Sequence, residues 1–216
     1  MAPRITVLIS GRGSNLAALL SAMSAGRLHG VVDRVIANRA DAPGLGIASA
    51  HGIATQIVDH QAFAAREAFE AALASAIDAS APDLIVLAGF MRVLGDAVVR
   101  RYAGRMINIH PSLLPLYPGL HTHRRALADG VRIHGCTVHF VTPDVDVGPI
   151  IAQAAVPVCD GDDEETLAAR VLEAEHALLP AVVRWYCTGR LVIDGHRVHV
   201  RDEETSRDTV LIAPAA

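Results

Sequence analysis

Hydrophobic residues in the first part of the chain form short continuous runs, which clusters of glycine, proline and polar residues separate. The apolar run at 4–10 is rich in β-branched residues and predicts a strand, which a glycine turn at 11–14 ends. Leucine and methionine then recur at helical spacing. Further strands are expected at 31–38, 55–58 and 84–88, and further helices at 44–51 and 62–79. Strands that alternate with helices imply right-handed crossovers and a parallel sheet covered on both faces.

The pattern changes beyond residue 106, where irregular loops containing proline and glycine separate the apolar runs. Strands are expected at 107–109, 137–141 and 150–158, and a long amphipathic helix at 163–186, which Pro180 should kink or break. Residues 191–200 predict a hairpin that turns at Asp194-Gly195. The whole pattern predicts an α/β fold, in which a doubly wound, Rossmann-like, mostly parallel sheet continues into a mixed sheet.

Composition narrows the class of protein. The chain has 216 residues, of which 51% are hydrophobic and 19% charged, as expected for a globular protein with a real core. A net charge of -4 and few aromatic residues argue against nucleic-acid binding. No apolar run is long enough to span a membrane, and the three cysteines lack paired spacing, so a cytoplasmic protein is expected. No linker or repeat divides the chain, which predicts one domain over 1–200 and a tail or peripheral strand over 201–216.

The basic residues exclude some kinds of catalysis. All nineteen are arginines, because the sequence contains no lysine. Schiff-base chemistry, pyridoxal phosphate anchoring and the Walker A nucleotide site all need a lysine ammonium group, so the sequence excludes them.

The glycine turn after the first strand is a candidate phosphate site. Backbone N–H groups at such a turn, together with the positive end of the following helix, attract anions. The dinucleotide fingerprint fails, because Leu16 occupies the position of its last glycine and the second strand ends in Asn38 rather than an acidic residue. Ser14 and Asn15 are short polar residues that either cap the helix or bind a phosphate. The turn favours a monophosphate over a dinucleotide, and a plain helix cap is the alternative.

A second polar cluster follows the strand expected at 107–109. Asn108 and His110 are two residues apart, so their side chains point to the same face of a strand. Asp144 and Asp146 lie in a turn between two later strands, which could bring a carboxylate beside His110. An amide donor, an imidazole and a carboxylate suit acyl transfer, because two donors can stabilise an oxyanion while the acid holds the imidazole in its charged form.

Each of these residues also has a simpler interpretation. A histidine near a strand end is often structural, and an aspartate in such a turn can bond its own backbone. Ser112 could suggest a serine hydrolase, but the chain lacks the G-x-S-x-G nucleophile elbow. A metal site is a further alternative, with the residues His121, His123, His139 and Asp146.

Five stretches together resemble one enzyme family. They are ISGRGSNL at 9–16, LAGFMR at 87–92, NIHPSLLP at 108–115, YPGLHTH at 117–123 and HFVT at 139–142. In this order they closely resemble the phosphoribosylglycinamide formyltransferases, which carry out the third step of de novo purine biosynthesis. The likeness extends from about residue 5 to residue 191. It implies a phosphate-binding half over 1–100 and a catalytic, folate-binding half over 101–200.

The resemblance implies a role for each candidate residue. The formyl donor would be 10-formyltetrahydrofolate and the acceptor glycinamide ribonucleotide, in an enzyme that is a monomer or homodimer and needs no metal, membrane or nucleic-acid partner. The implied catalytic residues are Asn108, His110 and Asp146. The residues implied to bind the ribonucleotide are Gly13, Ser14, Asn15 and Glu175. Those implied to border the folate are Arg66, Met91, Arg92, Val93, Leu94, Asn108, Thr142 and Asp146.

Two departures and three rivals accompany this likeness. Val147 replaces a glycine common in the family and could stiffen or narrow the folate loop, and Leu116 replaces a common lysine. A formyltetrahydrofolate hydrolase, another folate formyltransferase and a nucleotide-binding protein without turnover remain alternatives. The hydrolases and the tRNA formyltransferases are expected to carry an additional domain.

Overall fold

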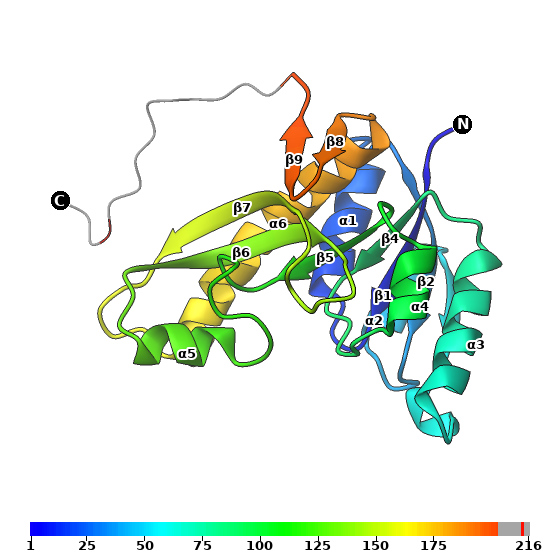
Figure 1. Ribbon diagram of the computed structural model, residues 1–216, viewed down its shortest axis with the longest axis horizontal. Coiled ribbons are helices and arrows are strands. Elements are labelled where there is room, and N and C mark those ends of the chain that lie inside the picture. Colours follow the sequence, from blue (N-terminus) through cyan, green and yellow to red (C-terminus); the bar gives the residue numbers. More distant parts are fainter. Residues whose placement is uncertain (203–212, 214–216) are drawn as a thin grey trace.

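The computed structural model describes residues 1–202 and residue 213, and nine of its elements form a single sheet (Figure 1). The strands are β1 (Arg4–Ile9), β2 (Val31–Ala37), β3 (Ala54–Ile57), β4 (Leu84–Leu87), β5 (Met106–His110), β6 (Ile133–Phe140), β7 (Ile150–Pro157), β8 (Leu191–Asp194) and β9 (Arg197–Val200). The helices are α1 (Ser14–Ser24), α2 (Gly44–Ala50), η1 (His60–Ala62), α3 (Arg66–Asp78), α4 (Asp96–Arg101), α5 (Thr122–Ala128) and α6 (Glu164–Cys187).

The strand order β3-β2-β1-β4-β5-β6-β7-β9-β8 confirms the predicted fold class. Strands β3, β2, β1, β4 and β5 are parallel, as the alternation of strands and helices predicts. Strand β6 is antiparallel to both of its neighbours, β5 and β7. The antiparallel β8–β9 hairpin joins the sheet through one parallel pair between β9 and β7. The doubly wound half therefore continues into a mixed half without a break in the sheet.

Two layers of helices cover the sheet. Ile5, Val7 and Ile9 of β1 pack with α1 and α6 in one buried cluster. Leu8 points to the opposite face and packs with α3 and α4 in the other cluster, as expected from the alternation of side chains along a strand. Both clusters consist of buried, mostly aliphatic residues, so both faces of the parallel half are covered.

The long helix α6 does not break at Pro180, so that part of the prediction is wrong. Its N-terminus carries a capping box in which Asp163 accepts from the Thr166 N–H and the Thr166 hydroxyl accepts from the Asp163 N–H. Leu179, next to the proline, is fully buried against the sheet. Packing on both sides of Pro180 holds the helix together, because one proline removes only one helical hydrogen bond.

Several boundaries differ from the prediction. The helix expected at 62–79 begins only at Arg66, because Phe63 and Ala65 are extended and the separate turn η1 precedes them. The hairpin turns at residues 195–196, since Asp194 pairs with Arg197, so the predicted turn is off by one residue. Helices α4 and α5 have only six and seven residues, which is too short for a periodic pattern to reveal.

Two expectations concern the periphery of the molecule. Most of the segment 201–216, expected to be a tail or peripheral strand, lies outside the described residues. Within the described part of the chain, no helix combines the length and the apolar character needed to cross a membrane.

Candidate active site

Four polar side chains share one face where β5 meets β6. Asn108 and His110 lie two positions apart on β5 and so point the same way, as predicted. The antiparallel register places His139 opposite Asn108 and Thr137 opposite His110. Cross-strand neighbours lie about 5 Å apart, so this register brings the four side chains into contact distance.

A cavity of about 470 Å³ opens beside this face. Asn108, His110 and Asp146 all line it. The predicted folate-bordering residues that line it are Met91, Arg92, Val93, Leu94 and Thr142. Much of the remaining wall is apolar, as is usual for a pocket that takes a flat organic ligand.

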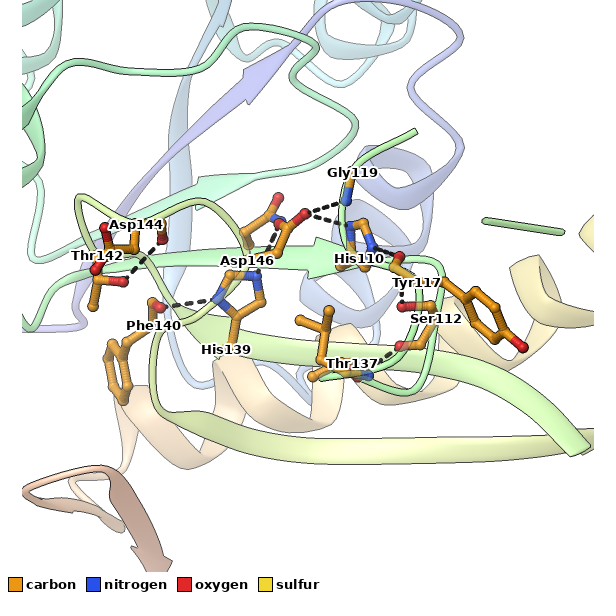
Figure 2. Close-up of polar contacts among 12 residues, drawn as sticks. His110, Ser112, Tyr117, Gly119, Thr137, His139, Phe140, Thr142, Asp144 and Asp146 are labelled. Carbon is orange, nitrogen blue, oxygen red and sulfur yellow. Dashed lines mark hydrogen bonds and ion pairs between the residues drawn. The ribbon is translucent and has the colours of Figure 1, made fainter. Parts of the chain in front are cut away.

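The His110 ring lies between two acceptors (Figure 2). Its Nε2 lies 3.0 Å from the carbonyl oxygen of Tyr117, and its Nδ1 lies 3.5 Å from Oδ2 of Asp146. Because a carbonyl can only accept, the Nε2 atom carries a proton. The nitrogen that faces Asp146 is therefore Nδ1.

Asp146 is held in a backbone conformation that few residues adopt. Its φ is +58°, in the left-handed region, and its Oδ2 accepts a hydrogen bond from the Gly119 N–H at 2.8 Å. Gly148 fixes the same loop, since a Cβ there would lie 1.8 Å from the Phe140 carbonyl oxygen. Val147 is 66% exposed, does not line the cavity and is not among the residues with positive φ. It therefore does not narrow the pocket.

His139 is neutral and fixes the orientation of the Asn108 amide. Its Nδ1 donates to the Phe140 carbonyl at 2.9 Å, so its Nε2 is free to accept from Nδ2 of Asn108 at 3.2 Å. Burial lowers the pKa of His139, and the nearby Phe140 carbonyl and Asp146 carboxylate only partly offset this effect. The 3.8 Å contact between His139 and Asp146 is therefore not an ion pair at neutral pH.

The glycine turn after β1 exposes the N-terminus of α1. Gly13 is the N-cap with φ +76°, and no side chain caps the helix, so Ser14 and Asn15 do not cap it with their side chains. A Cβ on Gly13 would lie 2.7 Å from the Cα atom of Gly44, which explains the glycine. The first-turn N–H groups therefore lack a side-chain partner, as an anion site requires.

Asn15 is turned away from this turn and toward α6. Its Nδ2 donates to Oε2 of Glu175 at 2.7 Å, and both side chains are buried. Oδ1 of Asn15 is buried without a hydrogen-bond partner. Burial raises the pKa of Glu175, although the Asn15 hydrogen bond acts against this shift. The pair offers acceptor atoms to a ligand with hydroxyl groups.

Some predicted binding residues lie apart from the cavity. Its wall does not include the predicted ribonucleotide-binding residues Gly13, Ser14, Asn15 and Glu175. Arg66 is also absent from the wall, but it bonds the Val93 carbonyl at 2.9 Å, directly behind the cavity lining, and pairs with Glu70. The assignment of these five residues to substrates stays a prediction.

The histidines do not form a recognisable metal site. Among residues 1–202 and residue 213, no group of three or more His, Cys, Asp and Glu side chains is arranged to hold a metal ion. His121 and His123 line the cavity instead. Burial is the main cause that lowers the pKa of His123, so this ring is neutral at neutral pH.

Sequence reasoning missed three features of this site. They are the Asn108 contact of His139, the Tyr117 carbonyl on His110, and the buried ring of His134, which packs edge-to-face on His123 with centroids 5.3 Å apart. The first depends on the register between β5 and β6, which no local pattern reveals. The other two depend on how the loop after β5 folds back.

Comparisons with known proteins agree with this geometry. Residues 3–183 match the family described as formyl transferase. Phosphoribosylglycinamide formyltransferase of Escherichia coli strain K12 is 54% identical over 87% of this chain and 88% of its own length. The crystal structure of glycinamide ribonucleotide transformylase 1 from Symbiobacterium toebii has a TM-score of 0.90 at 49% identity, over 92% of this chain and 93% of that chain.

A less similar structure belongs to an enzyme with a different activity, a formyltetrahydrofolate deformylase. The formyltetrahydrofolate deformylase from Burkholderia mallei has a TM-score of 0.84 at 30% identity, over 93% of this chain and 70% of that chain. Its identity is well below that of the transferases. The chain belongs to the formyl transferase family, and within it to the phosphoribosylglycinamide formyltransferases.

Proposed function

We propose that this protein transfers the formyl group of 10-formyltetrahydrofolate to the amino group of glycinamide ribonucleotide. The observation that carries the proposal is the convergence of Asn108, His110 and Asp146 on one cavity, although Asp146 comes from the loop between β6 and β7 and the other two from β5. The 54% identity to the phosphoribosylglycinamide formyltransferase of Escherichia coli supports the choice of acceptor.

The first step is attack by the amine on the formyl carbon. An α-amino group has a pKa near 8, so part of it is already neutral at pH 7 and needs no strong base. As the C–N bond forms, the carbonyl electron pair moves to oxygen. Asn108 has one Nδ2–H engaged by His139, which leaves the second for this oxygen. The Nδ1–H of a cationic His110 is the other donor.

The second step moves one proton and breaks one bond. The new ammonium loses a proton to Asp146, directly or through water, and the folate nitrogen gains it as its bond to the formyl carbon breaks. The products are the formylated amine and tetrahydrofolate, so atoms and charge balance. The 3.5 Å distance between Asp146 and His110 supports this role, because the carboxylate is close enough to stabilise the imidazolium while it relays the proton.

The two substrates would bind to two different surfaces, the cavity and the glycine turn before α1. The folate would occupy the cavity and be bordered by Arg66, residues 91–94 and Thr142, while the phosphate would sit on the N-terminus of α1 at Gly13 and Ser14. The ribose hydroxyls would donate to the Asn15–Glu175 pair. Both substrates are small molecules, and we place the reaction in the cytoplasm, without a metal or a nucleic-acid partner, in a monomer or homodimer.

A single assay separates the proposal from its rivals. Purified protein is mixed with 10-formyltetrahydrofolate with and without glycinamide ribonucleotide, and tetrahydrofolate release is measured. Release that depends on the acceptor supports the transferase. Release without acceptor would instead indicate a hydrolase, and no release in either case would indicate a binding protein.

Asn108→Ala tests the oxyanion role. Removing one such donor typically lowers kcat about 10²- to 10³-fold. The variant should fold normally, because Asn108 is only partly buried. A kcat within a few-fold of the parent would contradict the role assigned to this amide.

A further inference from the structure

A chain of hydrogen bonds connects β7 to the His110 ring through residues that have no role in the reaction described above. It passes through the Gln153 amide, the Thr137 hydroxyl, the Ser112 backbone and hydroxyl, and the Tyr117 carbonyl. Figure 2 shows its inner part, where Thr137, Ser112 and Tyr117 lead to the ring of His110. The links have the distances of ordinary hydrogen bonds, except for the weaker contact at 3.3 Å between the Ser112 hydroxyl and the Tyr117 carbonyl.

The Thr137 hydroxyl is the centre of this network. It donates to the Ser112 carbonyl at 2.6 Å and accepts from the Leu114 N–H and from Nε2 of Gln153, both at 3.0 Å. These three bonds use its full capacity of one donor and two lone pairs. Thr137 is fully buried and is the cross-strand partner of His110, so it ties the loop after β5 to the strand opposite the catalytic ring.

Ser112 passes this restraint along the loop. It is fully buried, and its hydroxyl donates to the Leu116 carbonyl at 2.7 Å. Gln153 holds the same loop from β7, because its amide also donates to the Leu114 carbonyl at 2.8 Å. Tyr117, which follows Leu116, has φ +55°. A residue with a side chain adopts this conformation only when its surroundings impose it. The network supplies this restraint.

The restraint decides which nitrogen of His110 faces the reaction. The fixed Tyr117 carbonyl takes a hydrogen bond from Nε2, so Nδ1 is the nitrogen left to face Asp146 and the cavity. With the carbonyl displaced, the ring would lose the bond that fixes its rotation, and either nitrogen could face Asp146.

We propose that Thr137 is a positioning residue for the formyl transfer, which with Ser112 and Gln153 holds the Tyr117 carbonyl in place and so fixes the orientation of the His110 ring. The kinetic part of this inference rests on the proposed function. The orientation part concerns the protein without substrate and can be tested separately.

The experiment compares Thr137→Val, which removes the hydroxyl at nearly constant shape, with Thr137→Ser, which keeps it. The matched control is Thr6→Val, because Thr6 is equally buried and its hydroxyl bonds Ser80 at 2.7 Å, while neither residue lines the cavity beside His110. Steady-state kinetics give kcat and KM, and ¹⁵N–¹H spectra of the imidazole groups give the protonation of each His110 nitrogen.

Thr137→Val is expected to lower kcat roughly tenfold to a hundredfold, the usual cost of a small misplacement of a catalytic group, with little change in either KM. Its His110 Nε2–H signal should lose its hydrogen-bonded shift. Thr137→Ser should restore both properties. Thr6→Val should be destabilised by a similar loss of a buried hydrogen bond, yet keep kcat and the His110 signal of the parent.

A folded Thr137→Val protein with kcat within twofold of the parent and an unchanged His110 signal would overturn the proposal. If Thr137→Val does not fold, Gln153→Ala replaces it, because Gln153 is exposed and its loss removes two bonds to the network without opening the core. A smaller loss of kcat with the same spectral change is then expected, and unchanged values would again overturn the proposal. The spectra need no turnover, so a failure of the formyl-transfer assay in the parent leaves the test of the His110 hydrogen bond intact.

Discussion

Backbone groups form most of the candidate phosphate site, which is the glycine turn between β1 and α1. Side chains form the candidate catalytic cluster at the end of β5. The first region offers the free N–H groups of α1 and a glycine that cannot carry a side chain. The second region holds Asn108, His110 and Asp146 in place through bonds to His139, the Tyr117 carbonyl and the Gly119 N–H. A backbone site needs only the correct turn, but a side-chain site needs supporting residues.

Backbone strain follows the same division. Among the described residues, six other than glycine have positive φ. Two of them, His121 and Asp146, line the cavity, and a third, Tyr117, accepts a hydrogen bond from the His110 ring. None lies in the turn after β1, where Gly13 takes this conformation without strain. Strain of this kind persists only where neighbouring contacts impose it. Changes in the second region should therefore act mainly on catalysis, and changes in the first mainly on binding.

The largest expected effect is that of Asp146→Asn on kcat. Asparagine tolerates the left-handed backbone of this position, so the loop should keep its shape while the charge and the proton relay are lost. A fall in kcat of about 10²- to 10³-fold is expected, comparable with the loss of an oxyanion donor. Asp194→Asn in the exposed β8–β9 hairpin is the matched control and should behave like the parent. Equal kcat values for the two variants would break the comparison.

The next effect concerns the dependence of stability on pH. Burial, reinforced by the nearby His123, lowers the pKa of His134 to about 4. The unfolded chain binds this proton near pH 6.5, so stability is complete above that pH and falls as the pH drops toward 4, by up to about 3 kcal/mol. His134→Phe should flatten this decline, as urea unfolding at pH 7 and pH 4 can measure. The variant also loses the hydrogen bond between the His134 ring and the Pro111 backbone, which lowers the free energy of unfolding at both pH values alike. Only an unchanged difference between the free energies at pH 7 and pH 4 would therefore contradict the prediction.

The local sequence pattern was enough to predict the elements around the glycine turn after β1, but not those around the cluster at the end of β5. The nearly continuous apolar run before Gly11 predicts β1 to within one residue, because a strand buried on both faces is mostly apolar. In β6, His134 is polar yet buried, so the predicted strand starts at residue 137 while the observed one starts at Ile133. Local composition does not show that a tertiary contact will bury a polar residue.

The same reasoning applies to the candidate site. The spacing of Asn108 and His110 predicts a shared face correctly, and the turn at Asp146 could be expected nearby. The choice of Asp146 rather than Asp144 for His110 could not be made from the sequence, because it depends on the left-handed backbone at that residue. The role of Thr137 depends on strand register, which a single sequence does not specify.

Glu175 provides a smaller test within the first region. Burial raises the pKa of this carboxyl, so its charged form costs stability, and this cost appears as the pH rises through its folded-state pKa. Glu175→Gln should raise Tm by about 2–4 °C at pH 8, equivalent to about 1 kcal/mol for a chain of this size, with a smaller gain at pH 4.5. The KM for glycinamide ribonucleotide should rise, because the amide is a weaker acceptor for ribose hydroxyls. An equal change of Tm at both pH values would show that the charge is not the cause.

The smallest expected effect separates backbone freedom from side-chain contact in the second region. Val147 is exposed and outside the cavity wall, so its side chain should matter only by restricting the loop that carries Asp146. Val147→Gly adds backbone freedom worth about 0.4–1 kcal/mol, which predicts a two- to fivefold rise in the KM for the folate. Val147→Ala keeps a Cβ and should resemble the parent. If alanine and glycine raised KM equally, the valine side chain would have to contact the ligand, and the loop would act through its surface rather than through its stiffness.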